Sequence, residues 1–100
     1  MVRHIVTWCF KEEVEEAKKP ELKAAMAEHL EALAGKVPGL VSARFVAALL
    51  PSSTHDMVLL TEHNTPEDLK AYATHPEHVK VADTYVRPFV CNRTAIDFEE

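Results

Sequence analysis

Several features that mark other protein classes are scarce in this chain of 100 residues. It has two cysteines, Cys9 and Cys91, which form no C-x-x-C pair and are too few to cross-link a small secreted domain, so we expect reduced thiols. It has only two glycines and is 47% hydrophobic, which excludes collagen-like and disordered chains. The sequence therefore predicts a single folded domain over residues 1–100.

The chain also lacks an excess of positive charge. Eleven lysines and arginines stand against sixteen aspartates and glutamates, a formal net charge of -5. This sign disfavours nucleic acid as a partner, because a phosphate backbone attracts basic surfaces. No apolar run approaches the length of a transmembrane helix, and no cleavable signal is recognisable. We therefore expect no membrane partner and a cytoplasmic location.

The periodicity of the apolar residues predicts the order strand, helix, strand, strand, helix, strand. Alternating segments that are rich in β-branched and aromatic residues indicate strands, and apolar residues at helical spacing indicate helices. Proline at residue 76 disfavours a helical conformation at the residue before it, so we expect the second helix to be broken there. The predicted strands cover residues 2–10, 40–50, 56–64 and 90–98, and the predicted helices cover residues 20–35 and 65–86 with that break.

This order is typical of the α+β class and of the ferredoxin-like βαββαβ fold, an antiparallel four-stranded sheet with helices on one face. The strands are nevertheless apolar on both of their faces. Two helices cannot cover the second face, and another copy of the chain can. We therefore expect a homodimer formed by sheet-to-sheet packing.

Three short motifs point to a family: Val2-Arg3-His4-Ile5-Val6, Pro38-Gly39 and His75-Pro76-Glu77-His78-Val79. On these motifs, the chain resembles the stress-responsive α/β-barrel domain family, Dabb, over nearly its whole length. The resemblance implies a dimeric α+β barrel of ferredoxin-like protomers. Many members of this family are known only as stress-associated proteins.

One branch of the family, represented by plant olivetolic acid cyclase, closes a linear polyketide by intramolecular aldol condensation without a metal. The histidine of its H-P-x-H motif and a preceding tyrosine correspond here to His78 and Tyr72. A pocket histidine of its first strand corresponds to His4, whereas one in its third strand is replaced here by Met57. The resemblance thus implies His78 and Tyr72 as the catalytic pair and a different substrate.

The chemistry of these residue types fits an aldol closure. A neutral His78 can remove a proton next to a carbonyl, and the Tyr72 hydroxyl can stabilise the resulting oxyanion. Asp97, in the last strand, can orient an imidazole. We expect no cofactor and no metal, and a pocket for a small, largely apolar carbonyl or polyketide-like ligand. The expected ligand-binding residues are His4, Val6, Met26, Leu30, Met57, Leu59, His75 and Asp97.

Other interpretations of these residues stay open, and the sequence does not decide whether the protein is an enzyme. Tyr72 and His78 can also be half-buried structural residues that satisfy backbone groups at the helix break. The chain would then be a non-catalytic dimeric stress-response or assembly module. His75 can instead cap the following helix, and a metal site would gather His4, His75 and His78 at a spacing that is weak for this purpose.

His63, Arg93 and the two cysteines lie outside this group of candidate residues. We assign no role to His63 or Arg93, because a charge in an otherwise apolar strand is more typical of an edge or interface. In a ferredoxin-like sheet the first and last strands are neighbours, which would bring Cys9 close to Cys91.

Overall fold

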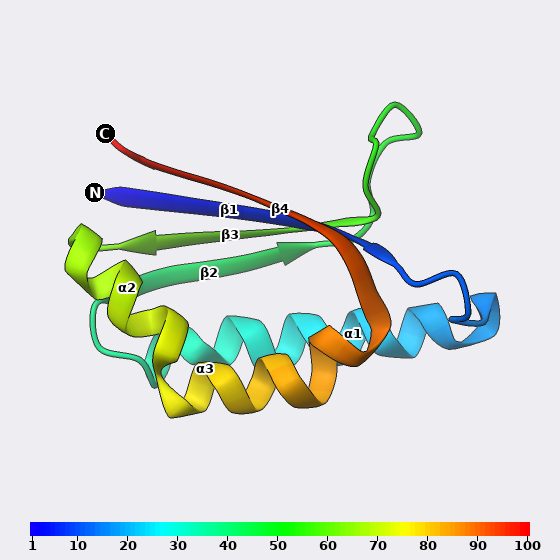
Figure 1. The fold of residues 1–100 in the computed structure, drawn as a ribbon, viewed down its shortest axis with the longest axis horizontal. Coiled ribbons are helices and arrows are strands. Elements are labelled where there is room, and N and C mark those ends of the chain that lie inside the picture. The colour runs from blue at the N-terminus through cyan, green and yellow to red at the C-terminus, as the bar shows by residue number, and fades with distance from the viewer.

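The computed structural model describes residues 1–100 and places β1 in the interior of a four-stranded sheet of order β2-β3-β1-β4 (Figure 1). The strands are β1 (Val2–Phe10), β2 (Leu40–Val46), β3 (Met57–His63) and β4 (Val90–Glu99). All three neighbouring pairs are antiparallel. The predicted α+β class and ferredoxin-like order are confirmed.

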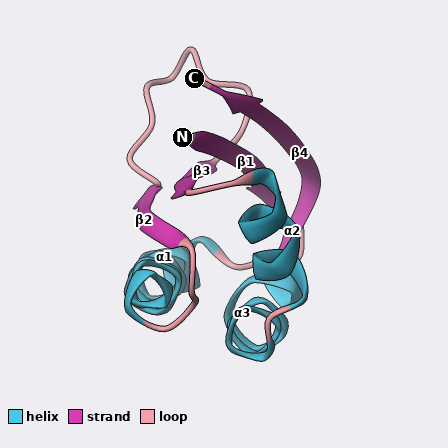
Figure 2. Ribbon diagram, turned by 90° about the vertical axis from the view of Figure 1, so that its left-hand side faces the viewer, coloured by secondary structure: helices cyan, strands magenta, loops and turns pink.

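The helices lie on one side of this sheet, with α1 beside α3 and with α2 near β1 (Figure 2). They are α1 (Lys19–Glu31), α2 (Pro66–Thr74) and α3 (Pro76–Val81). A 3-10 turn (Ala32–Gly35) continues α1, and a π turn (Ala82–Val86) continues α3. Two more 3-10 turns cover Glu16–Lys18 and Arg87–Phe89. None of the helices is both long enough and apolar enough to cross a membrane.

The break between α2 and α3 follows from local chemistry. The Thr65 side chain accepts a hydrogen bond from the backbone N–H of Asp68 at 3.1 Å, which caps the start of α2. His75 is extended because Pro76 follows it, and its Nδ1 accepts a hydrogen bond from the Glu77 backbone N–H at 3.1 Å. His75 therefore caps α3, one of the three roles considered for it.

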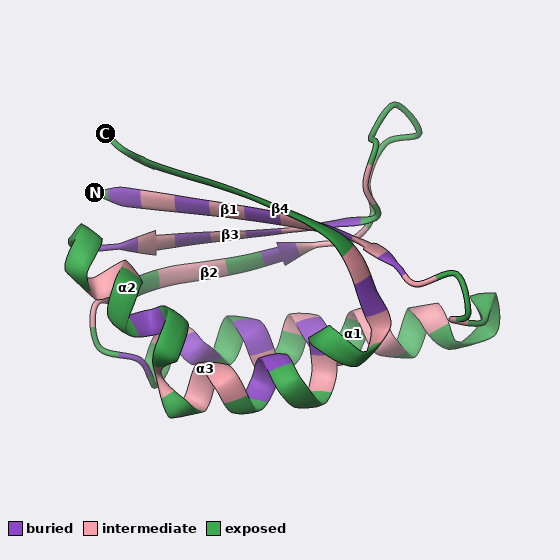
Figure 3. Ribbon diagram, in the orientation of Figure 1, coloured by how far each residue is buried: buried purple, intermediate pink, exposed green.

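The core lies between the helices and one face of the sheet (Figure 3). β1 alternates buried and half-buried residues along its whole length, as a period-2 strand requires. Its buried row is Val2, His4, Val6, Trp8 and Phe10, which faces Met26, Leu30 and Leu33 from α1 and the turn that follows it.

The other face of the sheet carries no helix. Half-buried or exposed apolar side chains lie on it, including Ile5, Leu60, Ile96 and Phe98. Ile96 is 61% exposed and Phe98 is 40% exposed. Neighbouring apolar side chains exposed on an uncovered sheet face are typical of an interface.

The second strand is shorter than the predicted range 40–50. Val46 pairs with Val58, and β3 begins only at Met57, so the residues after Ala47 have no strand opposite them. Asp56 is instead held by β1, since its N–H donates to the Trp8 carbonyl at 3.0 Å and its carboxylate accepts from the Phe10 N–H at 2.8 Å.

β4 contains a bulge opposite Trp8. Thr7 pairs with Thr94 and Cys9 pairs with Cys91, so two residues of β4 face one residue of β1. One of these two, Asn92, has a φ of 53°, in the left-handed region that asparagine tolerates. Because the extra residue shifts the alternation, Val90, before the bulge, and Arg93, within it, both face the helices.

Candidate functional site

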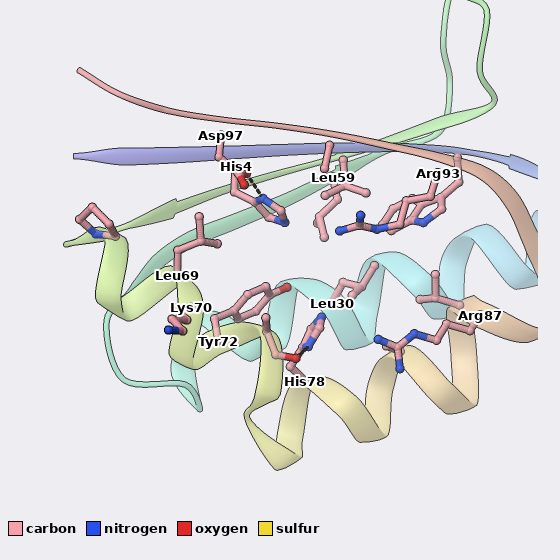
Figure 4. A pocket seen from close by; sticks show the side chains of 17 residues that line it. His4, Leu30, Leu59, Leu69, Lys70, Tyr72, His78, Arg87, Arg93 and Asp97 are labelled. Carbon is pink, nitrogen blue, oxygen red and sulfur yellow. Dashed lines mark hydrogen bonds and ion pairs between the residues drawn. The ribbon is translucent and has the colours of Figure 1, made fainter.

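A cavity of about 460 Å³ lies between the sheet and the helix layer (Figure 4). β1, β3 and β4 supply its upper wall in this view, and α1, α2, α3 and the turns after α3 supply the rest. Seven of the ten predicted site residues line it: His4, Val6, Leu30, Leu59, Tyr72, His78 and Asp97. Most of the lining is apolar, which suits a small organic ligand.

His78 lies in the first turns of α3, where its ring faces the cavity. Its Nδ1 is 3.1 Å from the carbonyl oxygen of Ala73. A carbonyl can only accept, so Nδ1 carries the proton and the neutral ring keeps its lone pair on Nε2. Burial lowers the pKa of His78, and the nearby cations Arg87 and Arg93 lower it further, against the opposite effect of the Ala73 hydrogen bond. His78 is therefore neutral near pH 7 and able to accept a proton.

Tyr72 lies in α2, one residue before the Ala73 carbonyl that holds His78. Its ring centroid is 4.3 Å from that of His78. The residue is 2% exposed and lines the cavity, and Figure 4 shows its hydroxyl on the cavity side. Burial raises the pKa of Tyr72 to about 12. The hydroxyl is thus protonated at neutral pH and available to donate a hydrogen bond.

His4 and Asp97 face each other across the β1–β4 pair. The His4 Nδ1 donates a hydrogen bond to the Asp97 carboxylate, which fixes the ring orientation. Figure 4 shows the ring pointing from the sheet toward Tyr72, and the two ring centroids are 6.3 Å apart. The register of the sheet therefore adds a third polar side chain to the same end of the cavity.

Three of the residues expected to bind ligand lie elsewhere. Met26 and Met57 are both 0% exposed and belong to the core, because side chains of the helix and sheet layers meet at these positions and leave no free volume. His75 caps α3 instead of lining the cavity. No group of three histidine, cysteine, aspartate or glutamate side chains is arranged to hold a metal ion.

The cavity region also contains residues to which the sequence assigned no role. His63 is 0% exposed, and its ring centroid is 5.0 Å from that of Tyr72. Its Nε2 is 2.9 Å from the Thr61 hydroxyl, whereas its Nδ1 has no partner. Burial, followed by the nearby His4, lowers the pKa of His63. Alternation along β3 places His63 on the same face as Met57, Leu59 and Thr61. This alternation is visible in the sequence and could have predicted that His63 faces the helices.

Arg87 and Arg93 line the cavity as well. Arg93 alternates with Ala95 and Asp97 along β4, so its face could have been read from the sequence once Asp97 was placed. Arg87 follows the π turn after α3, and no simple periodicity of the sequence indicates its position.

Comparison with known proteins places this geometry in a family. The family model for the stress-responsive A/B barrel domain, Dabb, matches residues 2–100. The chain belongs to the Dabb family. No curated protein sequence matches the chain significantly.

Solved structures share the Dabb fold of this chain. A dimeric ferredoxin-like protein of unknown function from Bacteroides fragilis is 28% identical, with a TM-score of 0.89 over 99% of this chain and 95% of that chain. A second dimeric ferredoxin-like protein, from Thermobifida fusca, is 22% identical, with a TM-score of 0.77 over 99% and 90%. A hydroxynitrile lyase from Passiflora edulis is 15% identical, with a TM-score of 0.71 over 97% and 90%.

Proposed function

We propose that this Dabb protein binds a small, largely apolar carbonyl compound in the cavity and moves a proton next to its carbonyl group, without a metal, as an aldol cyclisation requires. One observation carries the proposal. The Ala73 carbonyl accepts a hydrogen bond from the Nδ1–H of His78, so that Nε2 is the free base, and the Tyr72 ring lies beside it in the lining of the same cavity.

The two side chains divide the proton chemistry. The Nε2 of His78 removes a proton from the carbon next to the ligand carbonyl, and the Tyr72 hydroxyl donates a hydrogen bond to the enolate oxygen that forms. In a cyclisation, the enolate carbon then bonds to a second carbonyl carbon of the same molecule. The oxygen of that second carbonyl takes the proton from His78, which returns the ring to its neutral form.

His4 completes the polar end of the cavity in this proposal. Its bond to Asp97 fixes the ring, so the ring nitrogen not used by Asp97 can meet a polar atom of the ligand. The apolar side chains Val6, Leu30 and Leu59 enclose the remainder of the ligand.

The proposed active form is a homodimer formed by sheet-to-sheet packing. The face that no helix covers carries Ile5, Leu60, Ile96 and Phe98, and a second copy would remove these side chains from water. Two structures that share the fold are described as dimeric, which supports this assembly. The hydroxynitrile lyase supports small-molecule chemistry at the level of the fold alone.

The test is exchange of the methyl protons of acetophenone for deuterium in D₂O, followed by NMR. The wild-type protein should accelerate exchange over buffer, and His78→Ala should lose about a hundredfold of that acceleration. Tyr72→Phe should lose part of it. His29→Ala is the control, because His29 stacks on Tyr85 at 3.8 Å and does not line the cavity.

The same NMR samples separate enzyme from binding module. Shifts of cavity resonances on adding acetophenone, without accelerated exchange, would support a non-catalytic ligand-binding module and overturn the acid/base role. A His78→Ala variant that melts well below the wild type, with neither binding nor exchange in the wild type, would support a structural role for His78 in a dimeric assembly module.

A further inference from the structure

The charge inside the cavity is opposite to that of the chain as a whole. Lys70, Arg87 and Arg93 line the cavity, and the only acidic side chain that lines it, Asp97, is engaged by His4. The whole chain has a formal net charge of -5. Lys70, Arg87 and Arg93 are all exposed, so they lie at the open rim of the cavity, where a local excess of positive charge attracts an anion.

Arg93 is directed into the cavity by the β4 bulge. The extra residue opposite Trp8, with Asn92 in the left-handed region, keeps Arg93 on the helix-facing side together with Ala95 and Asp97. Figure 4 shows its side chain reaching toward Leu59. Arg3 and Arg87 form ion pairs within the chain, whereas Arg93 forms no hydrogen bond or ion pair. Its guanidinium is therefore available to a ligand.

Arg87 lies on the opposite wall, in the helix layer (Figure 4). Its Nη1 pairs with Asp83, which holds the side chain in place and leaves other N–H donors free. Both arginines lie near enough to His78 to lower its pKa, and all three residues line the same cavity.

We propose that Arg93, assisted by Arg87, binds a carboxylate of the ligand, so that the substrate is an apolar keto acid. This inference rests on the proposed function for the position of the carbonyl group. The planar guanidinium donates two parallel hydrogen bonds to a carboxylate, which provides both affinity and orientation. A carboxylate fixed there would orient the carbonyl end of the molecule toward His78 and Tyr72.

The test uses two probes that differ in charge and by one methyl group, 4-acetylbenzoate and its neutral methyl ester. Isothermal titration at low salt should show about tenfold tighter binding of the carboxylate by the wild type. Arg93→Gln should remove this preference and leave the affinity for the ester unchanged. Arg93 makes no polar contact within the chain, so the variant is expected to fold.

Lys80→Gln is the matched control. It removes the same unit of positive charge from the exposed surface of α3, where it does not line the cavity. This variant should keep the wild-type preference for the carboxylate. An equal loss in Lys80→Gln and Arg93→Gln would overturn a specific subsite in favour of a general charge effect.

Benzoate, which has no ketone, separates the two proposals. Arg93-dependent binding of benzoate supports the carboxylate subsite even if acetophenone exchange fails. Equal affinity for 4-acetylbenzoate and its ester, with no effect of Arg93→Gln on either probe or on benzoate, would overturn the subsite and leave the proposed function standing.

Discussion

Cys9 on β1 lies directly opposite Cys91 on β4, and both are on the face of the sheet that no helix covers. Both are free thiols. The proposed second copy would cover the face that carries them. The rate at which the two thiols react with a soluble reagent therefore measures whether this face is exposed in solution.

We predict that Ile96→Glu converts the protein to a monomer. Ile96 is 61% exposed within one chain, so the substitution leaves the protomer core intact, while burial of the new carboxylate in a dimer would be costly. Light scattering after size exclusion measures the mass, and maleimide labelling of Cys9 and Cys91 should become faster.

Ala24→Glu is the control, because Ala24 is exposed on α1, and α1 lies on the other side of the sheet. It should leave the mass and the labelling rate unchanged. A wild-type protein that is monomeric at micromolar concentration, or an Ile96→Glu variant that remains a dimer, would contradict the interface.

The pH dependence of acetophenone exchange follows from the two shifted groups. The pKa of His78 is lowered by burial and that of Tyr72 is raised to about 12. His78, the base, therefore loses its proton at a pH below the ordinary histidine value of about 6.5. Tyr72, the hydrogen-bond donor, stays protonated far above neutral pH. We predict that the exchange rate is constant from pH 7 to about 9 and that it decreases when the pH is lowered below 6.5.

Tyr72→Phe should lower that constant rate and keep the acidic limb, because the limb belongs to His78. Loss of the acidic limb in Tyr72→Phe, or a rate that falls at pH 8, would assign the titration to other groups.

His63 makes the folded protein sensitive to acid. Its pKa is lowered in the fold by burial, so below about pH 6.5 the unfolded chain binds a proton that the folded chain does not. Stability should consequently fall with pH from about 6.5 down to the folded pKa. His63→Leu should make the melting temperature less dependent on pH between 7 and 5.

The slope is the relevant measurement here, because the Thr61 hydroxyl loses its partner in His63→Leu and the stability falls by about 1 kcal/mol at every pH. His78 contributes a slope of the same sign, so some dependence remains. His55→Leu, outside the core, is the control. An unchanged slope in His63→Leu would show that the buried ring does not account for acid sensitivity.

The two glycines should respond to alanine in opposite ways. Gly39 has a φ of +83°, and a Cβ there would lie 2.6 Å from the Cβ of Asp68. Gly39→Ala should cost at least about 1–2 kcal/mol from the backbone conformation alone, plus the steric overlap. Gly35 has no atom within 4 Å of the added Cβ and no positive φ, so Gly35→Ala should be neutral or stabilising by up to about 1 kcal/mol. Urea unfolding measures both, and similar values would contradict the strain at Gly39.

The alternation of β1 and the residue pair His75-Pro76 made much of this structure predictable. A period-2 row that includes His4 determines which face it occupies, and the break before Pro76 puts Tyr72 and His78 on two consecutive helices. These are local properties of the chain, so the sequence expresses them directly.

The remaining features depend on packing and register. Alternation gives the face of Met57 but not whether free volume lies above it, so Met26 and Met57 proved to be core residues. The bulge at Asn92 interrupts the period of β4, which explains why that strand alternates weakly in sequence. Counted forward from Val90, the period places Arg93 on the wrong face, whereas counted back from Asp97 it gives the observed face.

The strand order has a consequence for how the molecule is assembled. β1, the first strand of the chain, pairs with the last strand, and His4 meets Asp97 across 93 residues of sequence. Contacts of such long range close late, because the entropy of a large loop must be overcome before they form. We therefore expect the wall that holds Asp97 and Arg93 to be added to a chain whose helices and remaining strands are already in place, so that the cavity takes shape late in folding.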